Sequence, residues 1–231
     1  MTTIPRWVEV HRLAVAGGEA EIASDVGDRL GRVWLRTSRF ADVARLAELT
    51  LTLGPDAGAL YDLGWARRAT GSPGPALAAY QQALDLYRAD GHRGNEAATL
   101  SNIGLVYNNL GDRQRALDYY QQALPIRREL GDRAGEATTL NNIAGIRFRE
   151  GDLAGAKGIV DEVLEVVRAV GDLASEAMVS FNIAVLLHRM GRVEDAIAYQ
   201  RRAIDLAERT GHPALGRMRE FLANLRNGDE L

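Results

Sequence analysis

Apolar residues recur at helical spacing along the whole chain. Between positions 97 and 107, Ala97, Leu100, Ile103 and Tyr107 follow one another in steps of three or four. That spacing places the side chains on one face of an α-helix, whereas a half-buried strand needs strict alternation of apolar and polar residues. No stretch sustains such alternation, so the pattern predicts an all-α protein.

The helical pattern repeats with a period of 40 residues. Two series of glycines carry this period, twenty positions out of phase with each other: Gly71, Gly111, Gly151 and Gly191, and Gly91, Gly131, Gly171 and Gly211. Self-similarity of this kind is the signature of a protein built from repeated supersecondary units. The period defines four repeats, at 51–90, 91–130, 131–170 and 171–210, and predicts two helices in each.

The periodic glycines are predicted to mark the helix ends. A residue just past a helix C-terminus often adopts a left-handed conformation, which glycine reaches without steric cost. After most of these glycines stands a residue whose side chain can accept hydrogen bonds from the first amides of the next helix: Ser72, Asp112, Asp132, Asp152 and Asp172. We therefore expect tight turns between the helices rather than flexible linkers.

Small residues recur at a second register, where two helices are expected to cross closely. They are Gly64, Gly104, Ala144 and Ala184 in the first helix of each repeat, and Ala76, Ala116, Ala156 and Ala196 in the second. A larger side chain there would push the helices apart. One helix pair cannot bury its own apolar stripe, so the repeats are expected to stack and share a continuous core.

These positions resemble the tetratricopeptide repeat pattern. One repeat carries Leu63-Gly64, Gly71, Ala76, Tyr80 and Ala83, and the next carries Ile103-Gly104, Tyr107, Gly111, Ala116, Tyr120 and Ala123. The 40-residue spacing is similar to the long-helix subtype of the Pins/LGN group, kinesin light chains and many bacterial tetratricopeptide proteins. The resemblance covers residues 19–226 and implies a right-handed α-solenoid of antiparallel helix pairs, the tetratricopeptide superhelix.

The two ends of the chain are expected to complete one solenoid domain. A short N-terminal helix or cap is expected at 1–18, and a degenerate repeat at 19–53. A C-terminal capping helix is expected at 211–226, followed by a tail at 227–231.

Two further features modify this picture. In the third repeat Val160 replaces a tyrosine, and Gly155 and Gly158 stand inside the second helix, which predicts looser packing. Near the N-terminus, Ile4, Trp7 and Val8 would either cap the solenoid or form a patch for self-association.

Composition narrows the class of protein. The chain has 28 Lys and Arg against 31 Asp and Glu, and this net charge of -3 argues against a general electrostatic hold on nucleic acid or anionic lipid. It has no cysteine, which excludes disulfides and thiolate metal sites and favours a reducing compartment. Neither a signal peptide nor an apolar run of about 18 residues occurs, so we expect a cytoplasmic protein that does not enter a membrane.

The resemblance also implies where a partner binds. In tetratricopeptide solenoids the first helix of each repeat lines a concave groove, and one register of these helices holds Asp62, Asn102, Asn142 and Asn182. An asparagine amide can donate to and accept from a peptide backbone, whatever the peptide's sequence, and the similar long-helix families use asparagines in this way. The alternative is that each amide bonds a carbonyl of the preceding repeat, because a half-buried amide must find a partner.

A second set of candidates lies C-terminal to this register on the same helices, one to two turns further along. One register holds Arg36, Asn109, Arg149 and Arg189 with Ala69 interrupting it, and beside it lie Arg68, Asn108, Phe148 and His188. Facing inward, these side chains would make the groove locally basic and favour a peptide with Asp, Glu or a free C-terminus. The alternative is a solvated face with ion pairs inside the solenoid. Asn141 and Phe181 would flank the groove as a polar contact and an apolar anchor.

No motif supports an enzyme, a cofactor or a metal site. The sole lysine, Lys157, lies between glycines but lacks the spacing and the hydroxyl of a phosphate loop, and no zinc-protease, serine-hydrolase or dinucleotide-binding pattern occurs. The repeated Glu96, Glu136 and Glu176 resemble a metal array, but their position predicts helix-start electrostatics and ion pairs between repeats.

Two hypotheses of function follow. The first is a non-enzymatic scaffold that binds a partner peptide or helix in its groove. The second is a regulatory or sensor protein that responds to a signal peptide, or that serves a STAND ATPase, a caspase-like protein or a transcriptional effector, as similar bacterial repeat proteins do. An effector would be a separate chain, because only residues 1–18 are left unassigned to repeats or caps.

Overall fold

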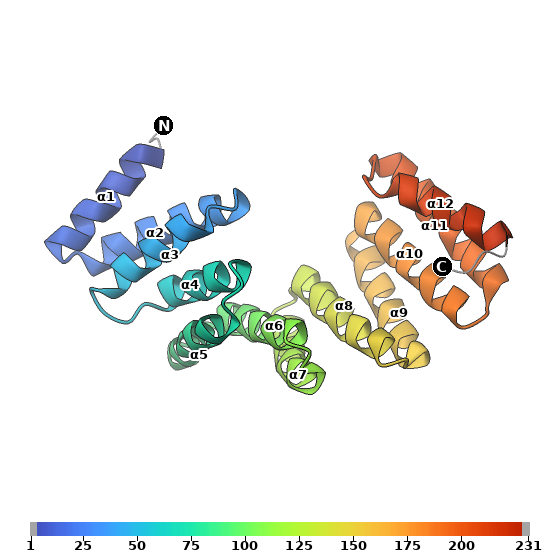
Figure 1. The fold of residues 1–231 in the computed structure, drawn as a ribbon, viewed down its shortest axis with the longest axis horizontal. Helices are drawn as coiled ribbons and strands as arrows, with labels where there is room; N and C mark the ends of the chain where they lie inside the picture. The colour runs from blue at the N-terminus through green and yellow to red at the C-terminus, as the bar shows by residue number, and fades with distance from the viewer. Residues whose placement is uncertain (1–3, 228–231) are drawn as a thin grey trace. The chain divides into compact units, whose positions relative to one another are not determined.

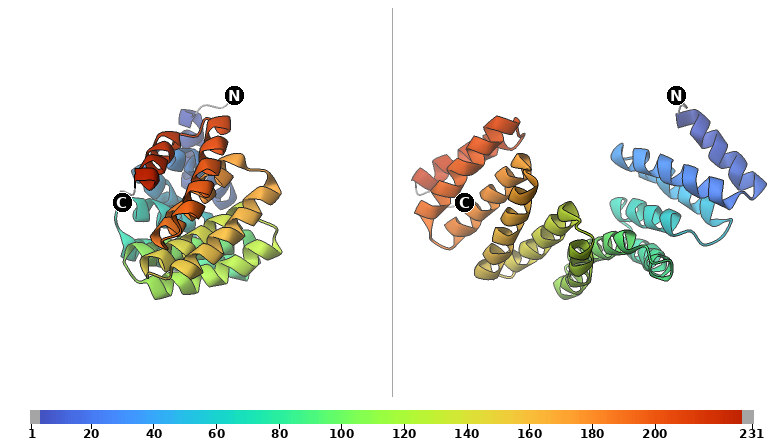
Figure 2. Two further views of the ribbon diagram at one scale, coloured as in Figure 1. Left: turned by 90° about the vertical axis from the view of Figure 1, so that its right-hand side faces the viewer. Right: turned by 180° about the vertical axis from the view of Figure 1, so that it is seen from behind.

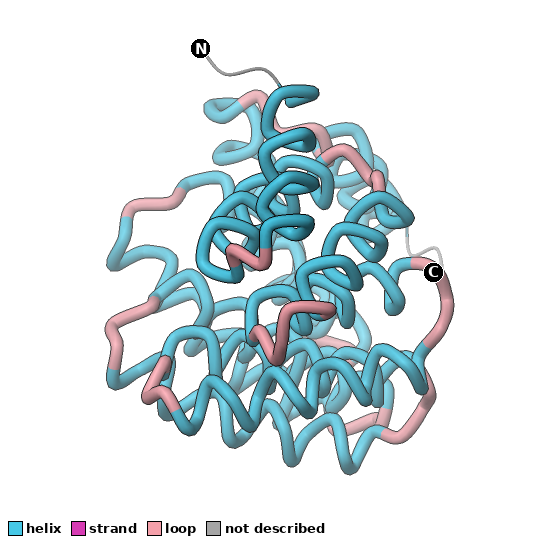
Figure 3. The backbone as a smooth tube through the Cα atoms, turned by 90° about the vertical axis from the view of Figure 1, so that its left-hand side faces the viewer, coloured by secondary structure: helices cyan, strands magenta, loops and turns pink. Residues whose placement is uncertain are grey.

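The computed structural model describes residues 4–227, and this part of the chain forms twelve α-helices and no strand (Figures 1 and 3). The all-α prediction is therefore confirmed. The contacts divide the chain into two compact bodies, and the boundary along the sequence falls between Ile126 and Arg127. We call the described residues 4–126 the N-terminal body and 127–227 the C-terminal body, and each is described by itself.

The N-terminal body contains six complete helices and most of a seventh. They are α1 (Ile4–Gly17), α2 (Ala20–Arg36), α3 (Phe40–Leu51), α4 (Ala57–Ala69), α5 (Pro73–Ala89), α6 (Arg93–Asn109) and α7 (Arg113–Glu129), which runs across the boundary. Consecutive helices pack side by side, as α4 and α5 do, and α2 also contacts α4 (Figure 1). Each helix thus buries its apolar face against neighbours from its own and the adjoining repeat.

The C-terminal body contains two complete helix pairs and a last helix. They are α8 (Arg133–Arg149) with α9 (Leu153–Val170), α10 (Leu173–Arg189) with α11 (Val193–Thr210), and α12 (Leu215–Asn227) (Figure 2). Helix α12 buries Met218, Phe221 and Leu225, and Met218 joins a cluster with Ala203 and Leu206 of α11. Beyond Asn227, the expected tail lies outside the described residues.

The predicted helix-end glycines are confirmed. All eight have a positive φ, between 63° at Gly211 and 83° at Gly111. Four of the predicted caps are also present: Asp132, Asp152 and Asp172 each accept a hydrogen bond from the backbone N–H three residues on, at 2.9, 2.8 and 3.0 Å, and Asp112 does so at 3.1 Å.

The predicted cap at Ser72 is wrong. Its side chain accepts no hydrogen bond at the start of α5. A capping hydroxyl accepts from the second or third amide of the helix, and here the third position is Pro75, which has no N–H. A proline-rich first turn therefore replaces the side-chain cap.

The predicted close helix crossings are confirmed by the two glycines in the N-terminal body. A Cβ added to Gly64 would lie 2.7 Å from the ring of Tyr80, and one added to Gly104 would lie 2.8 Å from the ring of Tyr120. Both tyrosines are fully buried. The rings fill the space that the missing side chains leave.

The repeated glutamates form ion pairs, as predicted. Glu96, Glu136 and Glu176 are 3–5% exposed. Glu96 accepts hydrogen bonds from Arg88 and Arg93, and Glu136 accepts them from Arg128 and Arg133. Glu176 differs because its second partner is Arg202 of α11 beside Arg168 of α9. Each carboxylate joins the start of one repeat to the last turn of the helix before it.

Neither a cluster of metal-ligating side chains nor a membrane-spanning helix occurs in the described part of the chain. Within 4–227, no three His, Asp or Glu side chains come together as a metal site would require. Nor does any helix in that range have the length and apolar character to cross a bilayer.

Candidate binding groove

A groove of the C-terminal body runs between α8 and α10. It contains two hollows of about 380 and 480 Å³, one toward the C-terminal ends of these helices and one toward their N-terminal ends. Asn141 of α8 and Asn182 of α10 line both hollows and so stand where the two meet. Residues of α9 also line both hollows: Val160 lines one, and Val166, Val167 and Val170 line the other. We call the whole feature the α8–α10 groove.

The groove follows from the 3.6-residue period of the two helices. Residues 141, 145 and 148 of α8 lie one turn apart on one face, as do 178, 182 and 185 of α10. The C-terminal hollow is lined by Asn141, Ala144, Gly145, Phe148, Arg149, Val160, Phe181, Asn182, Val185 and Leu186. Sequence analysis placed Asn182, Phe148, Arg149, Asn141 and Phe181 at the groove, and all five line this hollow.

Two replacements in the third repeat create the C-terminal hollow. Gly145 occupies the register where the two preceding repeats have Trp65 and Leu105, and a Cβ there would meet only the Arg149 side chain, at 3.7 Å. Val160 occupies the register of the buried tyrosines Tyr80 and Tyr120. The looser packing predicted from Val160 is found here as open space. Sequence analysis missed Gly145, although a lone glycine at an otherwise apolar register was the signal.

The two amides at the centre of the groove are exposed. Within residues 4–227, neither Asn141 nor Asn182 has a hydrogen-bond partner. Each carries two N–H donors and a carbonyl acceptor, the groups that a peptide backbone pairs with. Asn142 lies one position after Asn141 and is half-buried, and it lines neither hollow. The amide pair that borders the open space is thus Asn141 and Asn182.

The same pair of registers is closed in the N-terminal body. Asn102 lies 41 positions after Tyr61, as Asn182 does after Asn141. The Asn102 amide donates to the Tyr61 hydroxyl at 2.8 Å and to the Ala98 carbonyl at 3.1 Å. Asn102 therefore bonds to the preceding repeat, as the alternative to peptide binding requires, although its partner there is a tyrosine hydroxyl and not a carbonyl.

Asp62, the first member of the predicted ladder, packs between helices. A Cβ added to Gly31 of α2 would lie 2.0 Å from its Oδ2 atom, so the carboxylate rests directly on α2. Burial raises the pKa of Asp62 to about 7, and the nearby carboxylates of Asp28 and Asp56 add to the rise. The four ladder positions therefore have different surroundings, and they do not form one uniform row of free amides.

Aromatic and aliphatic side chains form the floor of the C-terminal hollow. Phe148, Phe181 and Val185 are half-buried, and Leu186 is buried. Phe181 packs edge-on against Phe221 of α12, with 5.6 Å between the ring centroids. The capping helix thus supports one wall, and the surface that an occupant would touch is mainly apolar.

Two arginines stand at the C-terminal ends of the groove helices. Arg149 is the last residue of α8 and Arg189 the last of α10, and both are exposed. The Arg189 guanidinium carbon lies 5.5 Å from the centroid of the Phe148 ring, so the cation rests on the aromatic floor. This end of the groove can therefore pair with an anionic group.

Other predicted candidates lie elsewhere. His188 packs edge-on against Phe221 at 6.0 Å and lines neither hollow. Asn109 is exposed at the end of α6, in the N-terminal body, which also contains Asp62 and Asn102. Arg68 stacks over Trp65 at 5.2 Å. These positions share a register with the groove residues without sharing their surroundings.

Comparisons with solved structures show the same fold. BtubC (BKLC) from P. vanneervenii is similar at 17% identity and a TM-score of 0.76, over 91% of this chain and 93% of that one. The apo quorum sensor NprR from B. thuringiensis is similar at 16% identity and a TM-score of 0.76, over 95% of this chain and 64% of that one. A STAND protein with a tetratricopeptide repeat sensor, PH0952 from Pyrococcus horikoshii, is similar at 16% identity and a TM-score of 0.75, over 97% of this chain and 39% of that one.

Comparisons of sequence identify the family. No curated protein matches the chain. Models of the tetratricopeptide repeat match residues 95–169 and 135–209, and a further tetratricopeptide model matches 58–89. Together with the all-α solenoid fold, these matches show that the chain belongs to the tetratricopeptide repeat family.

Proposed function

We propose that the chain is a protein-interaction module that holds an extended segment of a partner protein in the α8–α10 groove. The observation that carries the proposal is the exposed amide pair Asn141 and Asn182, which has no hydrogen-bond partner among the described residues and has a hollow on either side. Peptide backbones pair with such amides independently of sequence, while hollows beside them select side chains. No catalytic step is part of this proposal.

The lining of the groove defines the chemistry of the segment. An apolar side chain fits the C-terminal hollow, over Phe148 and Phe181. Arg149 follows Asn141 by eight residues, which is about 12 Å along a helix and matches three to four residues of extended peptide. The segment therefore carries an acidic side chain or a free C-terminus three to four residues from the backbone held by the amides.

A library of displayed peptides, selected on the immobilised protein, tests the proposal. The tightest peptide is then titrated by fluorescence anisotropy against wild type, Gly145→Leu and Asn141→Ala/Asn182→Ala. Gly145→Leu fills the hollow with the residue type of the preceding repeat, at a position with free space for a Cβ, so the fold is retained. We expect both variants to weaken binding roughly tenfold or more, the amide variant through lost hydrogen bonds worth about 1 kcal/mol each.

The matched control is Asn109→Ala, which removes an exposed amide of the N-terminal body. It should bind as wild type does, and all three variants should keep the circular dichroism of wild type. Undiminished binding by Gly145→Leu, or a library that yields no groove-dependent peptide, would refute the proposal.

A sensor role is the second candidate, favoured by the similarity to two proteins described above, a quorum sensor and a STAND protein with a tetratricopeptide repeat sensor. In a sensor the bound peptide changes the conformation that an effector recognises. Small-angle scattering of the protein with and without the selected peptide separates the candidates. A scaffold keeps its radius of gyration, and a sensor changes it.

Self-association through the N-terminal face is a further proposal. Ile4 and Val8 are 41% and 37% exposed, and they line a hollow of about 520 Å³ with Leu46 and Leu49, while Trp7 packs inward against α2 and α3. Light scattering across a dilution series should show a dimer that Val8→Glu abolishes. A monomer at every concentration would exclude it.

A further inference from the structure

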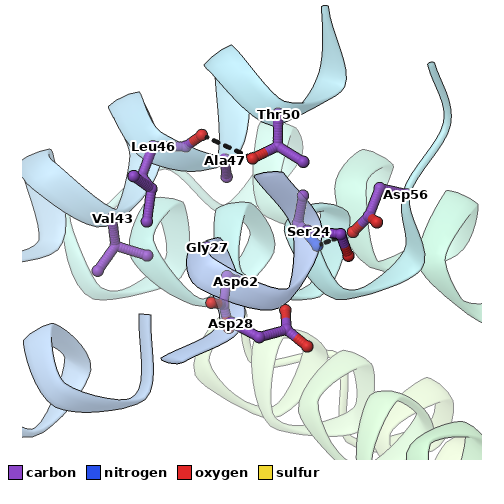
Figure 4. Close-up of a pocket in the computed structure, with 10 residues that line it drawn as sticks. Ser24, Gly27, Asp28, Val43, Leu46, Ala47, Thr50, Asp56 and Asp62 are labelled. Atoms are coloured by element: carbon purple, nitrogen blue, oxygen red, sulfur yellow. Dashed lines mark hydrogen bonds between the residues drawn. The ribbon is translucent and has the colours of Figure 1, made fainter. Parts of the chain in front are cut away.

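The contact between α2 and α4 is built from two aspartate–glycine pairs. Asp62 of α4 lies against Gly31 of α2, where an added Cβ would be 2.0 Å from its Oδ2 atom. In return, Asp28 of α2 lies against Gly58 of α4, where an added Cβ would be 2.5 Å from its Oδ1 atom. Figure 4 shows both carboxylates beside the same small cavity. On each helix, an aspartate carboxylate thus contacts the backbone of the other helix at a glycine, where no side chain intervenes.

Carboxylates outnumber cations around this contact. The cavity measures about 10 Å³, room for about one water molecule, and Asp28, Asp56 and Asp62 all line it. Asp56 is committed to the start of α4, where it accepts from the Ala59 N–H at 2.7 Å. Within residues 4–227, neither Asp28 nor Asp62 forms an ion pair, and Arg32 is the nearby cation, with its Nε atom on the Asp28 carbonyl.

Three further titratable or polar groups face the cluster. His11 of α1 is buried beside Gly27 and shares a 2.8 Å hydrogen bond with Thr50 of α3, and burial lowers its pKa. Tyr87 of α5 has its pKa raised by burial and by Asp28 and Asp62. Neither His11 nor Tyr87 supplies a positive charge near neutral pH, so neither of them compensates a negative charge on Asp62.

We propose that the paired aspartate–glycine contacts make the α2–α4 junction a proton-dependent joint, tight when Asp62 carries a proton and loosened when Asp62 is ionised. A protonated Asp62 adds no charge to the acidic cluster and can donate its proton to a neighbouring oxygen. An ionised Asp62 repels Asp28 and Asp56 and is a half-buried charge that forms no ion pair within residues 4–227 and that Arg32 offsets only in part.

The direction of the pH effect follows from linkage. Burial and the neighbouring carboxylates hold the folded-state pKa of Asp62 at about 7, above the ordinary value of 3.8. Between these values the folded chain binds more protons than the unfolded chain, so its stability falls as pH rises. The full cost of the ionised carboxylate is reached about one pH unit above this pKa, and further alkalinisation adds none from this residue.

Urea unfolding followed by tryptophan fluorescence tests the joint, because all three tryptophans, Trp7, Trp34 and Trp65, lie in the N-terminal body. His11, whose pKa is lowered by burial, contributes the opposite pH dependence in every variant, so the wild type is compared with Asp62→Asn, which has a neutral side chain of nearly the same shape. The wild-type midpoint should fall relative to that of Asp62→Asn between about pH 6 and about pH 8. At about pH 8, Asp62→Asn should stabilise the folded state roughly tenfold relative to wild type.

The matched control is Asp90→Asn, which removes an exposed carboxylate of the same body and should keep the wild-type pH dependence. A ¹³C titration of the Asp62 carboxyl in the folded wild type gives a readout that needs no variant. A titration midpoint below about 5, or an Asp62→Asn protein less stable than wild type at about pH 8, would overturn the proposal.

Discussion

At the scale of single residues, glycines occupy three different settings in this chain. At Gly111 and the other periodic turns, the backbone has a positive φ that side chains rarely adopt. At Gly104 the backbone is helical, and the limit is the Tyr120 ring, 2.8 Å from where a Cβ would stand. A third kind, Gly158, lies in α9 with no atom within 4 Å of its missing side chain.

These differences predict opposite effects of the same substitution. Gly104→Ala should lower the free energy of unfolding by about 1–3 kcal/mol, because the new methyl group overlaps the buried ring of Tyr120. Gly158→Ala should raise it by up to about 1 kcal/mol, because alanine is the better helix former and meets no neighbour. Urea unfolding by circular dichroism measures both. Equal changes for the two variants would mean that the ring contact does not limit residue 104.

At the scale of helices, buried glutamates connect consecutive elements. Burial disfavours the charged form of Glu176, but hydrogen bonds from Arg168 and Arg202 outweigh it, so its pKa lies below the ordinary value. Glu96 and Glu136 follow the same pattern. An acid with a lowered folded-state pKa stabilises the fold above its unfolded pKa, about 4.5, and loses that contribution as pH falls through the folded value. The ion pairs of these three glutamates with their arginines, which we call the glutamate clamps, therefore weaken only in acid, outside the pH range in which Asp62 titrates.

Removing the glutamate of one clamp should lower the free energy of unfolding less than removing its two arginines. Glu176→Gln leaves two arginines that are about half exposed and rehydrate, so we expect a loss of about 1 kcal/mol. Arg168→Ala/Arg202→Ala leaves the buried carboxylate without either partner, so we expect a loss of about 3 kcal/mol. Urea midpoints by circular dichroism above about pH 6 compare them. A Glu176→Gln protein as unstable as the double arginine variant would show that the carboxylate itself supplies most of the stability.

At the scale of the whole molecule, the repeat period predicted the architecture well. Because glycine turns, aspartate caps and small crossing residues recur every 40 positions, each repeat carries independent evidence for the same helix pair. The cap at Ser72 failed where a local exception, Pro75, removed the amide it needed. Periodicity thus fixes what the repeats share.

The candidate site depends on what the repeats do not share. Asn102 and Asn182 are indistinguishable by register, yet one is bonded to Tyr61 and the other faces an open hollow. The difference comes from their neighbours 41 positions earlier and from Gly145, where a single side chain is missing. Asp62 could not be placed from register either, because its contact with Gly31 crosses to the degenerate repeat, which is out of phase.

The net charge and the groove charge have opposite signs, and this sets the salt dependence of binding. The chain as a whole carries -3, which repels an acidic peptide, while Arg149 and Arg189 at the end of the groove attract it. Contacts shorter than the Debye length, about 10 Å at 0.1 M salt, dominate once the peptide is bound. We therefore expect the affinity for the selected acidic peptide to fall as NaCl rises from about 0.05 to 0.5 M.

Arg189→Gln should flatten that salt dependence, because it removes a cation while keeping a long polar side chain over Phe148. Arg192→Gln, which removes an exposed arginine paired with Asp195 outside the groove lining, is the matched control and should keep the wild-type slope. Fluorescence anisotropy titrations at a series of salt concentrations give the slopes. An affinity that rises with salt would mean that repulsion by the overall negative charge governs binding. It would contradict the idea that the peptide pairs with the arginines at the ends of α8 and α10.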